Sequence, residues 1–386
     1  MNPDQSDDRP AGGVPDDVSL FDVLPDDVEA AAEEHAVLAT PVSAPAPVDA
    51  PPLLEVSGLR TWFHTRAGDV HAVDGVDLTV GRGEVLGLVG ESGSGKSVTM
   101  LSVLRLVDKP GRIVSGSVRF DGADLVTMGK RELHGIRGNR ISMVFQQPNA
   151  SLHPCFDAGR QISEVYEIHR NSRRKAGVEK AVEMLRTVGI PDPKRRAKSY
   201  PHQLSGGQAQ GVMIAMALAA EPELLIADEP TTALDVTIQA QILDLMRKLQ
   251  ADRGTSVVLI THDLGVVAEM AHRVAVMYGG QIVEQAPVAD LFAEPKHPYT
   301  VGLLGSVPVI GRRTEELLVI KGRVPTLIDP KPGCRFVERC PMRMDRCDQA
   351  TPALVQIEPG RQVRCFLHSD AAVEDTAVPV TIGSNA

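Results

Sequence analysis

The stretch GESGSGKS, residues 90–97, is the most informative part of this sequence, because it fits the pattern G-x-x-x-x-G-K-S. An apolar run, GEVLGLV, precedes it and a helical pattern follows it, which is the strand–turn–helix context that gives this pattern its meaning. The glycines permit positive φ and bring backbone N–H groups close to phosphate oxygens, and the helix N-terminus adds its partial positive charge. We therefore expect Lys96 to reach the β- and γ-phosphates of a nucleotide and Ser97 to bind Mg²⁺.

A second stretch, LLIADE at residues 224–229, supplies the acidic groups that such a site needs. Its apolar residues predict a buried parallel strand, so Asp228 lies at the carboxyl end of that strand, where it faces the phosphate site. Asp228 is the expected Mg²⁺ partner of Ser97, and Glu229 is placed to polarise an attacking water.

The remaining pattern predicts an α/β fold. We expect strands in LLEVSGLRTWF, HAVDGVDLTV, RISMVFQQP and TSVVLITHD, and a hairpin with a Gly-Gly turn in RVAVMYGGQIVEQA. The run VMIAMALAA predicts a buried helix. A helix-rich stretch covers about 158–200, and one of its helices is expected to bury a single face. That face comprises Val178, Ala181, Val182, Leu185 and Val188.

Composition limits the class of protein. The net charge of −10 comes from residues 1–50, which hold twelve acidic residues and one basic residue, so the rest of the chain is close to neutral. That segment is rich in Ala and Pro, and we predict a disordered tail over residues 1–52. Aromatic residues make up only 3%, and no basic stripe is present, which disfavours a nucleic-acid partner. No apolar run is long enough for a transmembrane helix, and we expect no signal peptide.

Further motifs make the chain resemble the ATP-binding cassette (ABC) family over about residues 53–370. LSGGQ at residues 204–208 resembles the family signature and follows Gly95 by 109 residues. The Gln of VFQQP, the Asp of TALD and the His of ITHD resemble the Q-loop, D-loop and switch histidine, which are Gln146, Asp235 and His262. Phe63 lies 27 residues before Gly90, where the family places an aromatic residue that stacks on adenine.

The resemblance implies a RecA-like P-loop core with an antiparallel β edge, a helical subdomain and a small irregular C-terminal domain. It implies Glu229 as the general base, His262 as a γ-phosphate contact and Gln146 as a γ-phosphate sensor, with Ser97, Gln146 and Asp228 at Mg²⁺. The signature would serve the nucleotide of a second cassette, so that ATP lies between two subunits. The implied nucleotide-binding residues are Phe63, Gly90, Ser92, Gly93, Gly95, Lys96, Ser97, Val98, Ser205, Gly206, Gly207, Gln208, Asp228 and Asp235.

The residues after the signature depart from the pattern. This chain has Ala209, Gln210 and Gly211 where the peptide-importer branch usually carries basic residues. The departure weakens the expectation of phosphate or interface contacts from this helix. The half-site built on the chain's own P-loop is intact, and we expect it to hydrolyse ATP.

Several stretches look like the dipeptide/oligopeptide importer branch, among them FQQPNASLHP, EPKHPYTVGLLGSVP and GRVPTLIDPKPGCRFVERCP. The resemblance implies an ATPase subunit on the cytoplasmic face of the membrane that drives peptide uptake. Its expected partners are a second, related cassette, two permease subunits and a solute-binding protein. An importer of another solute such as nickel, a soluble non-transport ABC ATPase, and a redox sensor with a vestigial cassette are the alternatives. The expected domains are the tail, a nucleotide-binding domain at 53–286 with a helical subdomain at about 150–204, an extension at 287–370, and a flexible end at 371–386.

Four of the five cysteines lie close together near the C-terminus, namely Cys334, Cys340, Cys347 and Cys365. A structural zinc site usually has a C-x₂₋₄-C pair, which is missing here, and looser spacings suit an iron–sulfur cluster. Disulfides are disfavoured in a cytoplasmic protein. A 4Fe–4S cluster, zinc and free thiols therefore remain open, and the resemblance implies the cluster. Cys155 lies apart from this group, and its apolar context predicts a small core residue.

Overall fold

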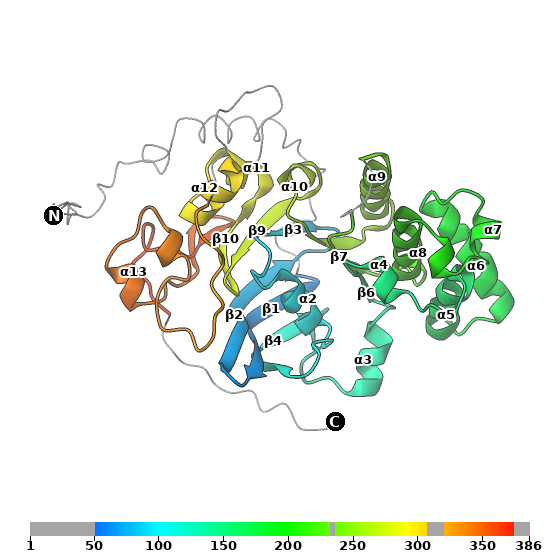
Figure 1. The fold of residues 1–386 in the computed structure, drawn as a ribbon, viewed down its shortest axis with the longest axis horizontal. Coiled ribbons are helices and arrows are strands. Elements are labelled where there is room, and N and C mark those ends of the chain that lie inside the picture. Colours follow the sequence, from blue (N-terminus) through cyan, green and yellow to red (C-terminus); the bar gives the residue numbers. More distant parts are fainter. Residues whose placement is uncertain (1–50, 232–235, 307–319, 374–386) are drawn as a thin grey trace, which may run out of the picture.

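The computed structural model describes residues 51–231, 236–306 and 320–373. Most of the predicted tail (1–50), Asp235 and most of the predicted flexible end (374–386) lie outside the described residues. The described chain folds into two β-sheets, a group of helices at one end of the molecule and a C-terminal extension at the other (Figure 1).

The smaller sheet is antiparallel, with the strand order β2-β1-β4-β5. Its long strands alternate buried and half-buried residues, because one face packs on the core. This sheet forms the expected antiparallel edge and lies beside helix α2, which follows the phosphate loop (Figure 1). The strands are β1 (Leu54–Thr65), β2 (Gly68–Val80), β4 (Gly111–Phe120) and β5 (Ala123–Asp124).

The larger sheet has the order β11-β12-β10-β9-β3-β8-β7-β6. Strands β9, β3, β8, β7 and β6 run parallel, and β3, β7 and β8 are buried along their whole length, as continuous apolar runs predict. The predicted Gly-Gly hairpin is confirmed between β9 and β10. The strands are β3 (Val85–Val89), β6 (Ile141–Val144), β7 (Leu224–Asp228), β8 (Ser256–Ile260), β9 (Arg273–Tyr278), β10 (Gln281–Pro287), β11 (Val355–Glu358) and β12 (Arg361–Val363).

Helices α5 to α8 form a group beside the β6 edge of the larger sheet, apart from α2 (Figure 1). The group shares an apolar cluster with one side of the larger sheet and with α9 (Val236–Arg253) and α10 (Leu264–Met270), and the predicted buried helix is confirmed in α8. The helices up to this point are α2 (Lys96–Val103), α3 (Lys130–Ile136), α4 (Pro148–Ser151), α5 (Ala158–Arg170), α6 (Arg174–Thr187), α7 (Pro193–Arg196), the 3₁₀ turn η2 (Pro201–Gln203) and α8 (Gly206–Leu218).

The extension continues the core. Strand β12 pairs antiparallel with β10, so strands from the C-terminal part of the described chain extend the larger sheet. Phe336 packs in one apolar cluster with Tyr278 of β9 and Tyr299 of α12. The later helices are α9 (Val236–Arg253), α10 (Leu264–Met270), α11 (Val288–Ala293), α12 (Pro298–Gly305), η3 (Val337–Arg339) and α13 (Arg346–Gln349).

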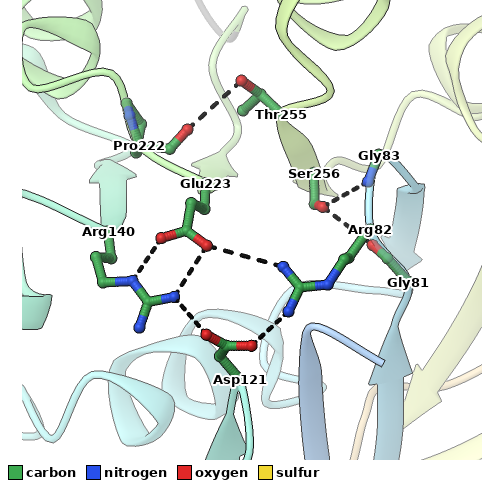
Figure 2. Close-up of polar contacts among 9 residues, drawn as sticks. All are labelled: Gly81, Arg82, Gly83, Asp121, Arg140, Pro222, Glu223, Thr255 and Ser256. Carbon is green, nitrogen blue, oxygen red and sulfur yellow. Dashed lines mark hydrogen bonds and ion pairs between the residues drawn. The ribbon is translucent and has the colours of Figure 1, made fainter. Parts of the chain in front are cut away.

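A network of ion pairs ties the two sheets together at the amino ends of the parallel strands (Figure 2). The Arg140 side chain, just before β6, binds Glu223 at 2.5 Å and Asp121 at 2.7 Å. Arg82, just before β3, also contacts Asp121. These side chains are 32–45% exposed, so the network contributes modestly to the free energy of unfolding and chiefly fixes the position of one sheet against the other.

Two predictions about individual residues are wrong. Ala181 and Leu185 of the predicted face are buried, but Val178 is 47% exposed, because α6 turns Gly177 and Met184 inward in its place. Cys155 is also exposed, since it lies in a short irregular segment between α4 and α5 rather than in a packed element.

Candidate active site

The phosphate loop connects β3 to α2, as predicted. Gly90 and Gly95 have φ values of +146° and +105°. A Cβ at Gly90 would lie 2.1 Å from the Met277 carbonyl oxygen, and one at Gly95 would lie 2.4 Å from the carbonyl oxygen of Ala72. Only glycine fits these two positions, so the loop closes tightly against β9 and β2.

Lys96 begins α2 and is buried to 7% exposure. Its ammonium donates to the carbonyl oxygens of Gly90 at 2.6 Å and Glu91 at 2.9 Å, and lies 3.4 Å from Ser94 Oγ. Burial lowers the pKa of Lys96, and the nearby charges of Glu229, Asp228 and Glu91 oppose that shift. The loop's own carbonyls therefore hold the cation where phosphate oxygens would bind.

Asp228 ends β7 and is 4% exposed. Burial raises the pKa of its carboxyl, a hydrogen bond from Ser97 opposes the rise, and Glu229 adds to it. Its Oδ1 atom is buried and has no hydrogen-bond partner among the described residues. A serine hydroxyl beside an unpaired carboxylate oxygen is the hard oxygen donor set that Mg²⁺ prefers, so Ser97 and Asp228 fit that ion.

Glu229 lies between two of the other predicted site residues. Gln146 Nε2 donates to Glu229 Oε2 at 2.8 Å, and His262 Nδ1 lies 3.2 Å from Glu229 Oε1. The backbone of Glu229 is left-handed, with φ +47°, and its N–H donates to the Ile260 carbonyl at 2.9 Å. A left-handed backbone conformation is strained for a glutamate. Such strain persists where the surrounding structure fixes the conformation, which is common at active sites.

The signature residues lie elsewhere, at the start of α8 in the helical group (Figure 1). Ser205 caps the helix by accepting from the Gln208 N–H at 3.3 Å, and the Gln208 side chain accepts from the Ser205 N–H at 3.3 Å. The S-x-x-Q spacing is the sequence signal for this capping box, and it predicts the helix start to the residue. Gly206 and Gly207 open the helix, so their N–H groups face outward at its positive end.

Gln210 is a site residue that sequence reasoning missed. It is 2% exposed, and its amide donates to the Pro230 carbonyl at 2.8 Å. It therefore ties α8 to the residue directly after Glu229. Gly211 packs against Ile190, from which an added Cβ would be only 3.1 Å away. The stretch that departs from the expected basic pattern is thus closely packed in this chain.

Phe63 lies near the end of β1, where it pairs with Val70 and Gly111. An added Cβ at Gly111 would lie 2.6 Å from Phe63 Cε1, so the ring lies directly against that glycine. Two residues earlier, the Thr61 and Ser102 hydroxyls are 2.7 Å apart, which anchors β1 to α2. The predicted adenine-stacking residue is therefore held near the phosphate-loop helix.

The four C-terminal cysteines, which lie within 32 residues of one another in sequence, line one cavity of about 10 Å³ together with Phe336 and Phe366. Burial raises the pKa of Cys334 to about 11 and that of Cys340 to about 12, and it raises the pKa of Cys365 as well. These thiols are protonated at neutral pH unless a ligand displaces the protons. In the described part of the chain, no three His, Cys, Asp or Glu side chains are arranged to hold a metal ion as they stand.

The structure thus brings together Gln146, Lys96, Ser97, Asp228, Glu229 and His262 around one phosphate loop at the carboxyl end of a parallel sheet. This combination defines a P-loop ATPase. Two family models match the chain: "ABC transporter" over residues 73–232 and "Oligopeptide/dipeptide transporter, C-terminal region" over residues 283–347.

Proteins of known family show the same similarity. The chain is 52% identical to the oligopeptide transport ATP-binding protein AppD of Bacillus subtilis, covering 84% of this chain and 99% of that protein. It is 46% identical to the dipeptide transport ATP-binding protein DppD of Escherichia coli, with the same coverage. The chain belongs to the ATP-binding proteins of oligopeptide/dipeptide ABC import systems, and it is an ABC transporter ATPase.

Solved structures support the fold. The dimeric ATP-binding cassette MJ0796, bound to ADP and phosphate, matches with a TM-score of 0.57 at 29% identity, over 61% of this chain and 98% of that one. The cassette cbiO1 of Clostridium perfringens matches with a TM-score of 0.53 at 27% identity, over 64% of this chain and 92% of that one. No helix in the described ranges is long and apolar enough to cross a membrane.

Proposed function

We propose that this chain hydrolyses ATP on its own phosphate loop and uses the cycle to drive uptake of di- or oligopeptides across the cytoplasmic membrane. The observation that carries the proposal is the placement of Glu229, which is held between Gln146 and His262. In that position its carboxylate can accept a proton from a water that attacks the γ-phosphate. Lys96 binds the β- and γ-phosphates, and His262 contacts the γ-phosphate.

Ser97 and Asp228 would hold Mg²⁺, with Gln146 as the third predicted ligand. The ion would neutralise charge on the phosphates. Gln146 also donates to Glu229, so the predicted γ-phosphate sensor and the proposed base are in direct contact. Gln146 lies two residues before α4, which leads to the helical group, and a change in its contacts would pass to those helices.

We propose that a second cassette completes the site. The donors at the start of α8 are Ser205, Gly206, Gly207 and Gln208, and they lie on the helical group rather than beside the chain's own α2 (Figure 1). A second cassette facing this one would bring its own nucleotide to these donors, which would act as a phosphate site at a helix N-terminus. Asp235 would contribute to the same interface. The dimeric MJ0796 structure supports this arrangement by analogy.

A groove of about 210 Å³ between the core and the helical group is the proposed docking site of a permease helix. The core side contributes Leu104, Leu106 and Phe145, and the helical side contributes Leu152 and Met213. Leu106 and Phe145 are 38% and 36% exposed, although they are large and apolar. Phe145 directly precedes Gln146, so a helix seated here would sense the state of the ATP site. This contact would place the chain on the cytoplasmic face of the membrane as a peripheral subunit.

The substitution Leu106→Asp tests this docking site. Because Leu106 is partly exposed, a charge there should leave the fold intact while weakening permease binding by about 30-fold, as expected for a central apolar contact worth about 2 kcal/mol. Co-purification of the full-length chain with its permease subunits measures the effect. Val178→Asp is the control, since Val178 is similarly exposed but lies on the outer face of α6. Equal recovery of both variants with the permease would reject the groove.

We further propose that the four cysteines bind a 4Fe–4S cluster, with a single zinc ion as the alternative. The support is that all four thiols of this group line one apolar cavity. Four thiolates are the usual ligand set of such a cluster, which would supply structural cross-linking or electron transfer to this extension. The boundaries 53–286, about 150–204 and 287–370 remain the proposed domain limits, with the extension as the cysteine-bearing unit.

Anaerobic purification with iron, sulfide and zinc analysis tests the cysteine proposal. We expect about four iron and four sulfide per chain with a coloured spectrum. Both should be lost in Cys340→Ser and retained in Cys155→Ser, because Cys155 is exposed and remote from the cavity. One zinc without colour would replace the cluster by a structural ion. Preparations free of metal would show that the thiols are unliganded, and the ATPase assignment would stand.

A further inference from the structure

The C-terminal extension holds the phosphate loop directly. Glu91, the second residue of the loop, is bound by both terminal nitrogens of Arg339, at 3.0 Å to Oε1 and 3.2 Å to Oε2. The backbone N–H of Glu91 donates to the Tyr299 hydroxyl at 2.8 Å. Two residues of the extension therefore fix one residue of the loop, although Arg339 lies 248 positions along the chain from Glu91.

Arg339 is itself fixed. Its Nε donates to the Lys321 carbonyl at 2.9 Å and Nη2 to the Ile320 carbonyl at 3.1 Å, while Nη1 reaches the Tyr278 hydroxyl at 3.3 Å. With the two bonds to Glu91, these contacts occupy all five donors of the guanidinium. The side chain is 5% exposed and stacks over Tyr278 at 5.7 Å. A guanidinium so fully satisfied holds its carboxylate in one place.

Glu91 links Arg339 to the nucleotide site, because its side chain and its backbone carbonyl contact different residues. Its side chain faces Arg339, while its carbonyl oxygen accepts from Lys96 Nζ at 2.9 Å. The position of the Lys96 ammonium thus depends on the same residue that the extension holds.

We propose that Arg339 is a positioning residue of the ATP site: through Glu91 it sets the shape of the phosphate loop for nucleotide binding. The 3₁₀ turn that carries it, Val337–Arg339, lies between Cys334 and Cys340 and is closed by hydrogen bonds from the N–H groups of Val337 and Cys340. The extension therefore acts on the affinity for ATP and leaves the catalytic contacts of Glu229 unchanged.

The test is a double-mutant cycle with Arg339→Ala and Glu91→Gln in the full-length chain. Each single substitution should raise the dissociation constant for ATP about 10-fold or more, the size expected for losing a hydrogen bond to a charged group. The double variant should be no worse than the more severe single variant, because both remove one interaction. In the assembled transporter, KM for ATP should rise with kcat preserved, since Gln146, Glu229 and His262 are untouched.

Arg343→Ala is the matched control. Arg343 forms a two-point ion pair with Asp348 at 2.9 and 2.8 Å in the same extension, but the pair is half exposed and does not contact the loop. The Arg343→Ala variant should bind ATP as tightly as the unmodified chain does. ATP binding by the unmodified chain in turn checks the ATPase assignment on which this inference rests. If Arg339→Ala does not fold, Glu91→Gln decides alone. ATP affinities within about twofold of the unmodified chain, or independent losses that multiply in the double variant, would overturn the proposal.

Discussion

Glu229→Gln is expected to bind ATP and to lose turnover by about 10²- to 10⁴-fold, the usual contribution of a positioned general base. The glutamine is isosteric with the glutamate. Its amide oxygen can still accept from Gln146, and its amide nitrogen can donate to His262, so both observed contacts survive. The strained backbone at this position also stays in place, because the Ile260 contact is made by the main chain. The loss can therefore be assigned to the missing base.

Phosphate release and ATP binding, measured on the same preparation, separate the two effects. Glu269→Gln serves as the control, because that carboxylate is 55% exposed, pairs with Arg247 on the surface and lies outside the site. Undiminished hydrolysis by the Glu229 variant would remove Glu229 from its proposed role. A parallel loss of ATP binding would show instead that its side chain maintains the loop.

Lys96→Ala is expected to abolish useful nucleotide binding. The substitution removes the cation that meets the β- and γ-phosphates and leaves the buried carbonyl oxygens of Gly90 and Glu91 without their donor. Loss of the expected charged contacts of Lys96 with the β- and γ-phosphates, at about 1.5–3 kcal/mol each, corresponds to an affinity for ATP lower by about 100-fold or more.

Direct titration with ATP measures this effect, with thermal unfolding followed in parallel to show that the chain is folded. Lys130→Ala, at an exposed position that begins α3, should bind ATP normally. An affinity for ATP in the Lys96 variant close to that of the unmodified chain would mean that the backbone of the loop suffices, and the proposed role of Lys96 would be withdrawn.

Features set by short segments could be predicted from the sequence. The phosphate loop, the strand that ends at Asp228 and the Gly-Gly hairpin each depend on a few neighbouring residues, and the structure has all three. The meeting of Gln146, Glu229 and His262 was implied only by the family resemblance. Parallel strands bring their carboxyl ends to one edge, which explains why the motifs converge there.

Features set by tertiary packing could not be predicted. Val178 has the helical spacing of a core residue, yet the orientation of α6 against α5 and α8 leaves it exposed. The buried contact of Gln210 with Pro230 depends on how α8 approaches β7. The pairing of Arg339 with Glu91 joins residues that are 248 positions apart in the chain. No local sequence pattern distinguishes an arginine that stays on the surface from one that becomes buried.

The pairing of β12 with β10 has a consequence for how such subunits can be shortened or recombined. The strand that covers β10 in the larger sheet comes from the C-terminal part of the described chain, with Val363 opposite Glu284 and Gln362 opposite Gln285. A protein cut after residue 286 would leave β10 as a bare edge whose free N–H and C=O groups could template pairing with another molecule. Exchange of C-terminal segments between related subunits must therefore preserve this strand register. The C-terminal region is structurally part of the cassette and cannot be added or removed freely.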